Sequence, residues 1–279
     1  SSPSQGLWRV IVVEDADRLG ESGANALLKA IEEPPEHTVW LLCAPSPEDM
    51  IATIRSRCRH LGLRIPTASA VADLLVREGV ATPDVALEAA RAAQSHIGLA
   101  RALARDPQMR ERRRAIITAP ASVRSVGEAV MAADRLLETA KAQADAQVSE
   151  RNAREKAELL RQLGMDEGES ATKASRTMIR QLEEDQKRRS KRALTDAIDR
   201  ALIDLLAIYR DVLMVQVGGD GELINTDLSD LVHEIAQDST RRQTLARVDH
   251  IETARKRLVS NGNPLLVLED MAISLRPQA

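Results

Sequence analysis

Val10-Ile-Val-Val-Glu-Asp-Ala-Asp17 begins with four consecutive β-branched residues and ends with three acidic residues and an alanine. Such a run is typical of a central strand in a parallel sheet, where both faces are buried. The acids then follow the carboxyl end of the strand, the edge at which α/β sheets place their ligands. This stretch therefore predicts an α/β layer with a polar site at one edge.

The next residues continue the alternation of strands and helices. Apolar residues at helical spacing over 24–31 predict an amphipathic helix, which Pro34-Pro35 stops. Residues 38–44 predict a second buried strand, 47–54 a short helix and 58–65 a third strand. This order predicts a parallel α/β layer, although three strands are too few for a complete domain. Because the chain starts almost directly with a core strand, we expect natural sequence before Ser1.

From Thr67 onward the pattern is helical. Three short helices are predicted over about 68–78, 83–94 and 98–105. Leucine and isoleucine at helical spacing over 194–213 predict a long core helix that Gly218-Gly219 terminates. The C-terminal half is therefore predicted to be all-helical.

Residues 138–192 are highly charged and rich in alanine, as on a solvated helix surface, with a loop predicted over 164–174. Asn261-Gly262 is expected to end a helix after Leu258, and Asn263-Pro264 to begin the last one.

The composition excludes several classes of protein. A net charge of −3 argues against a protein that coats nucleic acid, and two cysteines form neither a disulfide framework nor a zinc set. No apolar run approaches the roughly 18 to 20 residues that cross a bilayer. We therefore expect a cytoplasmic protein with reduced thiols, no metal site of its own and no membrane partner.

Two motifs carry chemistry. Glu14-Asp15 resembles a Walker B motif, although active ATPases usually have the order Asp-Glu and a plain polar strand end is the alternative. No G-x-x-x-x-G-K-[ST] phosphate loop occurs in the chain, so we expect it not to hydrolyse ATP by itself. Ser56-Arg57-Cys58 follows a predicted helix. There Arg57 is either a surface arginine or a finger that reaches a neighbour's phosphate, and Cys58 is expected only to pack.

Asn25-Ala-Leu-Leu-Lys-Ala-Ile-Glu-Glu-Pro-Pro35 is the most specific stretch. Together with the acids before it and Ser56-Arg57-Cys58 after it, it resembles the clamp-loader branch of the AAA+ family, and within that branch the delta-prime subunits of bacterial DNA polymerase III. The resemblance implies the C-terminal part of an AAA+ α/β domain over 1–66, a three-helix lid over 67–106 and a helical collar over 107–279. The charged insert at about 138–192 lies within that collar and has the least support from the resemblance.

The resemblance also implies roles for individual residues. Gly98 and Arg101 match the sensor 2 form, in which Gly98 permits close helix approach and Arg101 points at a nucleotide; an exposed arginine is the alternative. Glu14 and Asp15 would be a degenerate Walker B pair. Ser46 stands where sensor 1 is expected and matches poorly.

The resemblance implies a ring of five subunits that loads a sliding clamp on primed DNA. Arg57, with Ser56 and Cys58, would complete the ATP and magnesium site of a neighbouring subunit, and this chain would bind no cofactor. Its partners would be gamma/tau and delta subunits, the clamp and primer-template DNA, within the replisome and as a component of the DNA polymerase holoenzyme.

Two alternatives remain open at this point. The chain could be the ATP-hydrolysing gamma/tau-type motor of the same machine, with its phosphate loop upstream of Ser1. It could also be a separate helical DNA-binding or scaffold protein, as the basic clusters at 110–114 and 187–192 suggest.

Overall fold

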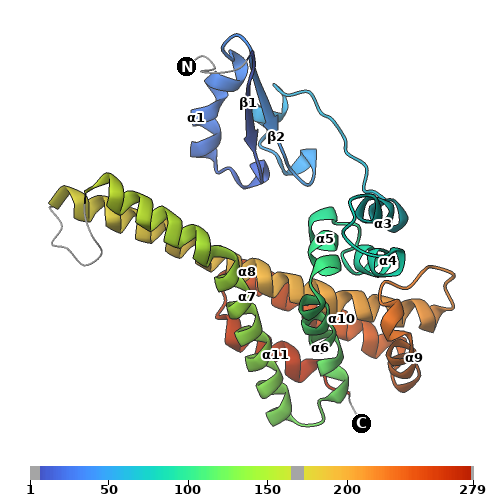
Figure 1. Cartoon of the computed structure of the whole chain (residues 1–279). Coiled ribbons are helices and arrows are strands. Elements are labelled where there is room, and N and C mark those ends of the chain that lie inside the picture. Colours follow the sequence, from blue (N-terminus) through green and yellow to red (C-terminus); the bar gives the residue numbers. More distant parts are fainter. Residues whose placement is uncertain (1–6, 165–172, 278–279) are drawn as a thin grey trace. The chain divides into compact units, whose positions relative to one another are not determined.

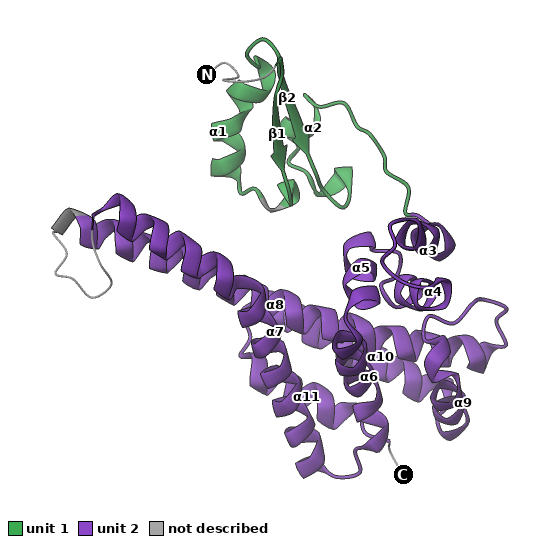
Figure 2. Ribbon diagram, in the orientation of Figure 1, with its two compact units in different colours: residues 1–65 green, residues 66–279 purple. Residues whose placement is uncertain are grey.

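The computed structural model describes residues 7–164 and 173–277. The chain separates into two compact units, residues 1–65 and 66–279 (Figure 2). The predicted end of the α/β part, at residue 66, falls next to this boundary. The further division of the second unit into a lid and a collar stays a prediction.

The first unit is built on a parallel pair of strands (Figure 1). β1 (Arg9–Val13) pairs with β2 (Thr38–Leu42) in parallel. α1 (Glu21–Glu32) connects them and packs Ala24 and Ile31 against one face of the sheet. The parallel pairing and the connecting helix confirm this part of the sequence prediction.

The predicted third strand is wrong. Residues 58–65 form no strand, and the sheet of the described residues contains only β1 and β2. Leu61, Leu63 and Ile65 are exposed. Since no neighbouring strand offers hydrogen bonds to this segment, its alternating apolar residues have no ladder to join.

The prediction that both strands are buried on both faces is also wrong. Val10 is 56% exposed and Val12 55% exposed, and Val39 and Leu41 are exposed on β2. Side chains alternate along a strand, so these four lie on one face of the sheet. Only the opposite face is covered by α1, which leaves an apolar surface open in the described chain.

The helix predicted over 47–54 consists of two short turns. η2 (Pro47–Asp49) is followed by α2 (Ala52–Arg55), and Met50 and Ile51 between them have extended backbone angles. Another short turn, η1 (Ala16–Arg18), follows β1. Ile54 of α2 is fully buried against α1, which anchors the short helix despite its length.

The second unit begins with three short helices, as predicted. They are α3 (Ala68–Arg77), α4 (Pro83–Ala92) and α5 (Ile97–Arg105). Gly79 ends α3 in the left-handed conformation, with φ at 67°, which a glycine adopts without strain. Most of the buried side chains between these helices are alanines. Short side chains fill a core at normal density only if the helices lie close together.

The remaining helices form the larger core of the second unit. They are α6 (Pro107–Ser122), α7 (Val126–Gln162), α8 (Lys173–Val217), η3 (Thr226–Leu228), α9 (Ser229–Asp238), α10 (Arg241–Val259) and α11 (Pro264–Ser274). The apolar residues predicted over 194–213 lie at the centre, where Leu202, Leu205 and Ile208 are fully buried. Asn263 caps α11 and Pro264 opens it, as predicted.

α8 is one continuous helix of 45 residues, so the charged insert and the core helix belong to the same element. Its first half runs beside the second half of α7 as a helical hairpin (Figure 1). The loop predicted at 164–174 lies largely outside the described residues.

Arg189 joins the two helices, since its Nη1 lies 2.8 Å from Glu155 Oε2. Arg189 and Arg151 lower the pKa of Glu155 to about 2.

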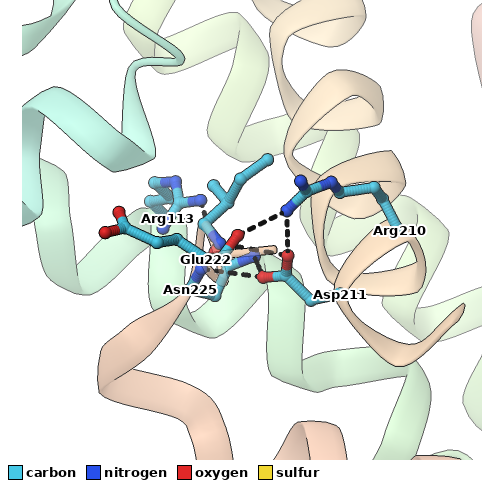
Figure 3. A network of polar contacts seen from close by, with 6 residues as sticks. Arg113, Arg210, Asp211, Glu222 and Asn225 are labelled. Atoms are coloured by element: carbon cyan, nitrogen blue, oxygen red, sulfur yellow. Dashed lines mark hydrogen bonds and ion pairs between the residues drawn. The ribbon is translucent and has the colours of Figure 1, made fainter. Parts of the chain in front are cut away.

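A polar network is buried where α8 meets the segment before α9 (Figure 3). Asp211 has no exposed surface. Its carboxylate accepts hydrogen bonds from the backbone N–H groups of Ile224, at 3.0 Å, and Asn225, at 2.8 Å. Arg210 Nη1 donates to the same carboxylate at 2.9 Å. The network thereby holds an irregular segment against the helix.

Arg113 of α6 extends this network. It donates to Asp204 Oδ1 at 3.0 Å and to Asn225 Oδ1 at 2.6 Å. Burial raises the pKa of Asp204, and the guanidiniums of Arg113 and Arg200 oppose that shift.

Among the described residues, no helix combines the length and the apolar character needed to cross a membrane.

The start of α10 provides a test of the local helix signal. Thr240 and Gln243 form a reciprocal capping box, in which each side chain accepts the other's backbone N–H. We expect Thr240→Ala to lower the free energy of unfolding by about 1 kcal/mol, because a helix N–H loses its acceptor. Urea unfolding measures this change. Thr195→Ala is the control, because Thr195 lies inside α8 and caps no helix; an equal loss in both variants would contradict the prediction.

Candidate functional site

Ser56-Arg57-Cys58 follows the last residue of α2. Ile54 fixes this helix by its burial, and Ser56 is the C-cap residue. Ser56 Oγ donates to the carbonyl oxygen of Thr53 at 3.1 Å. The serine thus closes the short helix and determines where Arg57 leaves the backbone.

Arg57 is held by three groups of its own unit. Its Nε donates to the Glu32 carboxylate at the end of α1. Its Nη1 donates to Thr53 O at 2.9 Å and to Ser56 Oγ at 3.3 Å. The guanidinium therefore has a defined orientation in the isolated chain.

The Nη2 group of Arg57 has no hydrogen-bond partner among the described residues. A guanidinium has five N–H donors, and both N–H bonds of Nη2 remain available. The Arg57 side chain is 39% exposed. The arrangement can present a fixed positive charge with two donors to an anion outside the unit.

Cys58 is an exposed free cysteine. Its amide N–H donates to Arg55 O at 3.3 Å. Partial desolvation raises the pKa of its thiol, which disfavours the nucleophilic thiolate. The side chain therefore has no feature of a catalytic cysteine.

Glu14 and Asp15 lie directly after β1, as predicted, and both are exposed. Asp15 adopts the left-handed conformation, with φ at 50°, which aspartate tolerates better than most residues. Beyond it, the Ala16 N–H donates to Cys43 O at 2.8 Å and ties together the carboxyl ends of the two strands.

Ser46 is the N-cap residue of η2, where its Oγ accepts a hydrogen bond from the Glu48 N–H at 3.3 Å.

Arg101 lies in the second unit and forms a two-pronged ion pair. Its Nε and Nη2 donate to the Glu78 carboxylate at 3.0 Å and 2.9 Å. Glu78 is the C-cap residue of α3, so the pair links α5 to α3. In this state Arg101 is an internal link, and a role toward a nucleotide stays a prediction.

Among the described residues no second helix closely approaches Gly98, and its expected role stays a prediction. A side-chain carbon added at Gly98 would meet only the ring of His96 within 4 Å, at 3.4 Å and 3.7 Å. His96 is the N-cap of α5 and its Nδ1 accepts from the Leu99 N–H. The two distances to the His96 ring are ordinary van der Waals distances, so the contacts of Gly98 in this structure do not require a glycine.

The structure thus brings Ser56, Arg57 and Cys58 together with two residues that sequence reasoning missed, Glu32 and Thr53. Glu32 lies inside the specific stretch 25–35, and Thr53 stands four residues before Arg57, one helical turn away. Both signals were present in the sequence. No three His, Cys, Asp or Glu side chains within 7–164 and 173–277 are grouped so that they could hold a metal ion.

Residues 1–67 match the family described as "DNA polymerase III, delta subunit". This region is therefore similar to subunits of the DNA polymerase III clamp loader. It includes Glu14, Asp15 and the Ser56-Arg57-Cys58 motif, whereas Gly98 and Arg101 lie outside the matched residues.

Curated proteins similar to this chain support the same clamp-loader family. The chain is 41% identical over 95 residues to the DNA polymerase III subunit delta' of Escherichia coli K12, which covers 34% of this chain and 28% of the relative. It is 48% identical over 58 residues to the subunit delta' of Haemophilus influenzae, or 21% of this chain and 18% of the relative. It is 39% identical over 87 residues to the subunit gamma/tau of Mycobacterium tuberculosis H37Rv, or 30% of this chain and 15% of the relative.

The aligned regions therefore span well under a third of these relatives. The similarity to clamp-loader subunits lies in part of the chain, which includes residues 1–67, and the expectation that natural sequence precedes Ser1 stays a prediction.

Proposed function

We propose that this chain is a subunit of the DNA polymerase III clamp loader, which places the sliding clamp on primed DNA. In this role Arg57 reaches the ATP of a neighbouring subunit in the ring. The observation that carries the proposal is the arrangement of Arg57 within the region similar to clamp-loader subunits. Its Nε and Nη1 are held internally, its Nη2 has no hydrogen-bond partner among the described residues, and the side chain is 39% exposed.

The chemistry of the side chain suits that role. A guanidinium stays positively charged at all physiological pH values, and each of the two N–H bonds of Nη2 can donate to a phosphate oxygen. Negative charge on those oxygens is redistributed as the γ-phosphate leaves, so a donor already in position stabilises the transition state. Glu32 and Thr53 supply the positioning, since they limit the orientations of the Arg57 side chain before any neighbour binds.

The ATP and magnesium ion of this reaction belong to the neighbour in our proposal. The 279 residues contain no phosphate-loop motif, whose backbone N–H groups and lysine would hold the β- and γ-phosphates. The chain therefore contributes to a shared site from one side. Gamma/tau and delta subunits would be its partners in the ring, in the cytoplasm at the replisome, and the clamp and primer-template DNA would bind the assembled ring.

The motor subunit of the same machine is the second candidate, because a gamma/tau subunit is among the similar proteins. The Glu14-Asp15 order disfavours it, since active motors usually have Asp-Glu. A phosphate loop encoded upstream of Ser1, together with ATP hydrolysis by this protein alone, would favour the motor.

Assembly tests membership in the complex. We expect the protein to form one stable complex with gamma/tau and delta subunits of the same organism, with one copy of this chain, as measured by native mass spectrometry. The matched control omits this chain from the mixture. A complex of the other subunits that excludes this chain would contradict the proposal.

A further inference from the structure

The second unit has two clusters of basic residues, and the structure uses them differently. In the cluster at 110–114 on α6, every arginine contacts a group of its own unit. Arg110 donates to Leu103 O, Arg112 to Asp106, Arg113 to Asp204 and Arg114 to Asp227. These guanidiniums stabilise the packing of α6, and all but Arg110 pair with a carboxylate.

The cluster on α8 is different in composition. Residues 186–195 read Gln-Lys-Arg-Arg-Ser-Lys-Arg-Ala-Leu-Thr, with no acidic residue among them. Arg189 faces α7, where it contacts Asn152 and Glu155. The other four basic residues are exposed, and we call them the α8 basic patch: Lys187, Arg188, Lys191 and Arg192.

The α8 basic patch has few internal partners. Among the described residues, Lys187 and Arg192 form no ion pair. Lys191 donates to the neutral amide oxygen of Asn261 at 3.0 Å, and Arg188 lies 4.0 Å from Asp185, the outer limit of an ion pair. Asp196 is exposed one turn after Arg192, and it is the acid nearest to that residue along the helix. The patch therefore keeps most of its positive charge.

The spacing forms a row of charges. The patch consists of two i, i+4 pairs, 187 with 191 and 188 with 192. The residues of each pair are neighbours on the helix surface, and the two pairs lie side by side. A rise of 1.5 Å per residue places each pair about 6 Å apart along the axis. A row of cations at this spacing suits a row of regularly spaced anions better than one small anion.

The composition of α8 itself favours a polyanion over a protein partner. Specific protein interfaces use buried aromatic or apolar anchors at their centre. On α8, no exposed large apolar side chain lies between Met178 and Val217. Binding to a phosphate backbone needs no such anchor, because it rests on charge and the release of counterions.

We propose that the α8 basic patch binds the phosphate backbone of DNA without sequence preference. The patch is an interaction surface of this chain itself, additional to Arg57. The choice of DNA over RNA rests on the proposed function, whereas the binding of a phosphate backbone rests only on the geometry of α8.

The test compares two variants of the full chain that lose the same charge. The first replaces the four patch residues by glutamine: Lys187→Gln, Arg188→Gln, Lys191→Gln and Arg192→Gln. The control also removes four positive charges from the hairpin, at arginines that pair with carboxylates of their own helix: Arg151→Gln, Arg154→Gln, Arg161→Gln and Arg180→Gln. Glutamine is a good helix former, and circular dichroism checks that both variants fold.

Fluorescence anisotropy with labelled primer-template DNA measures binding between 50 and 200 mM salt. A patch that neutralises four phosphates contributes a slope of about −3.6 to log K against log salt. We therefore expect the patch variant to lose most of that slope and about tenfold or more in affinity at low salt, while the control variant changes much less. Native mass spectrometry with the partner subunits is run on the same samples.

Each outcome decides the proposal. Equal losses in both variants would overturn it, because net charge alone would then explain binding. Unchanged DNA binding in the patch variant would also overturn the DNA-binding proposal. If that variant still assembled normally with the partner subunits, the clamp-loader proposal would be unaffected. Loss of assembly with unchanged DNA binding would show that the patch binds a protein. If the chain bound an RNA duplex more tightly than DNA, the choice of DNA would be overturned and RNA would be the ligand of the patch.

Discussion

Replacing Arg57 by alanine in a complex with an ATP-hydrolysing neighbour is expected to slow hydrolysis by about 10³-fold. The loss follows from the removal of a positioned cation from the transferring phosphoryl group, where charge stabilisation supplies most of the catalysis. The measurement is the steady-state ATPase rate of the assembled complex with clamp and primed DNA. Assembly itself is expected to persist, because the Arg57 side chain is 39% exposed and contributes little to the core.

Three further variants separate this role from a general surface effect. Arg59→Ala removes an exposed arginine two residues away and is expected to leave the rate unchanged. Arg57→Lys keeps the charge but loses the paired donors, so we expect only partial activity. Glu32→Gln weakens the anchor of Arg57 Nε and is expected to have a smaller effect than Arg57→Ala. An undiminished ATPase rate in the Arg57→Ala complex would rule out the finger.

Replacing Asp211 by alanine is expected to lower the free energy of unfolding by about 3–5 kcal/mol. Asp211 is fully buried, and its loss leaves the N–H groups of Ile224 and Asn225 without acceptors. Arg210 also loses its carboxylate partner. Because the Asp211 carboxylate accepts both of these backbone N–H groups, we expect the segment before α9 to detach from α8 first. Urea unfolding, followed by circular dichroism, measures the change.

Asp220→Ala is the matched control, because Asp220 is an exposed aspartate in the same connection between α8 and α9. Its loss is expected to change stability by less than about 0.5 kcal/mol. Asp211→Asn keeps the shape of the side chain but supplies one acceptor oxygen where the carboxylate supplies two. A loss below 1 kcal/mol for Asp211→Ala would contradict the view that this network holds the segment.

Local patterns predicted most of the helices. Apolar residues at helical spacing placed α1, and the helical pattern placed the three helices of 68–105, within a few residues, since an amphipathic helix encodes its own buried face. α9 was missed: its ten residues follow an irregular segment that is held by the buried carboxylate of Asp211. A tertiary contact of this kind leaves no periodic signal in the sequence.

Strands were predicted less well, for a physical reason. The alternating apolar residues at 58–65 predicted a third, less regular strand, but a strand exists only where a neighbour completes its hydrogen bonds. The same limit applies to the site. Ser56-Arg57-Cys58 was recognisable as a motif, whereas the pairing of Arg57 with Glu32 joins residues 25 positions apart and depends on how α2 packs against α1.

Local spacing and residue type were enough to predict the parallel α/β start, the helical remainder and the arginine motif. Which charges remain available depends on how the chain packs. Packing pairs Arg112, Arg113 and Arg114 with carboxylates and Arg101 with Glu78. The α8 basic patch stays exposed, and Nη2 of Arg57 has no partner among the described residues. Whether a charged side chain is paired or stays exposed depends on what packs beside it, and the packing depends on residues distant in the chain.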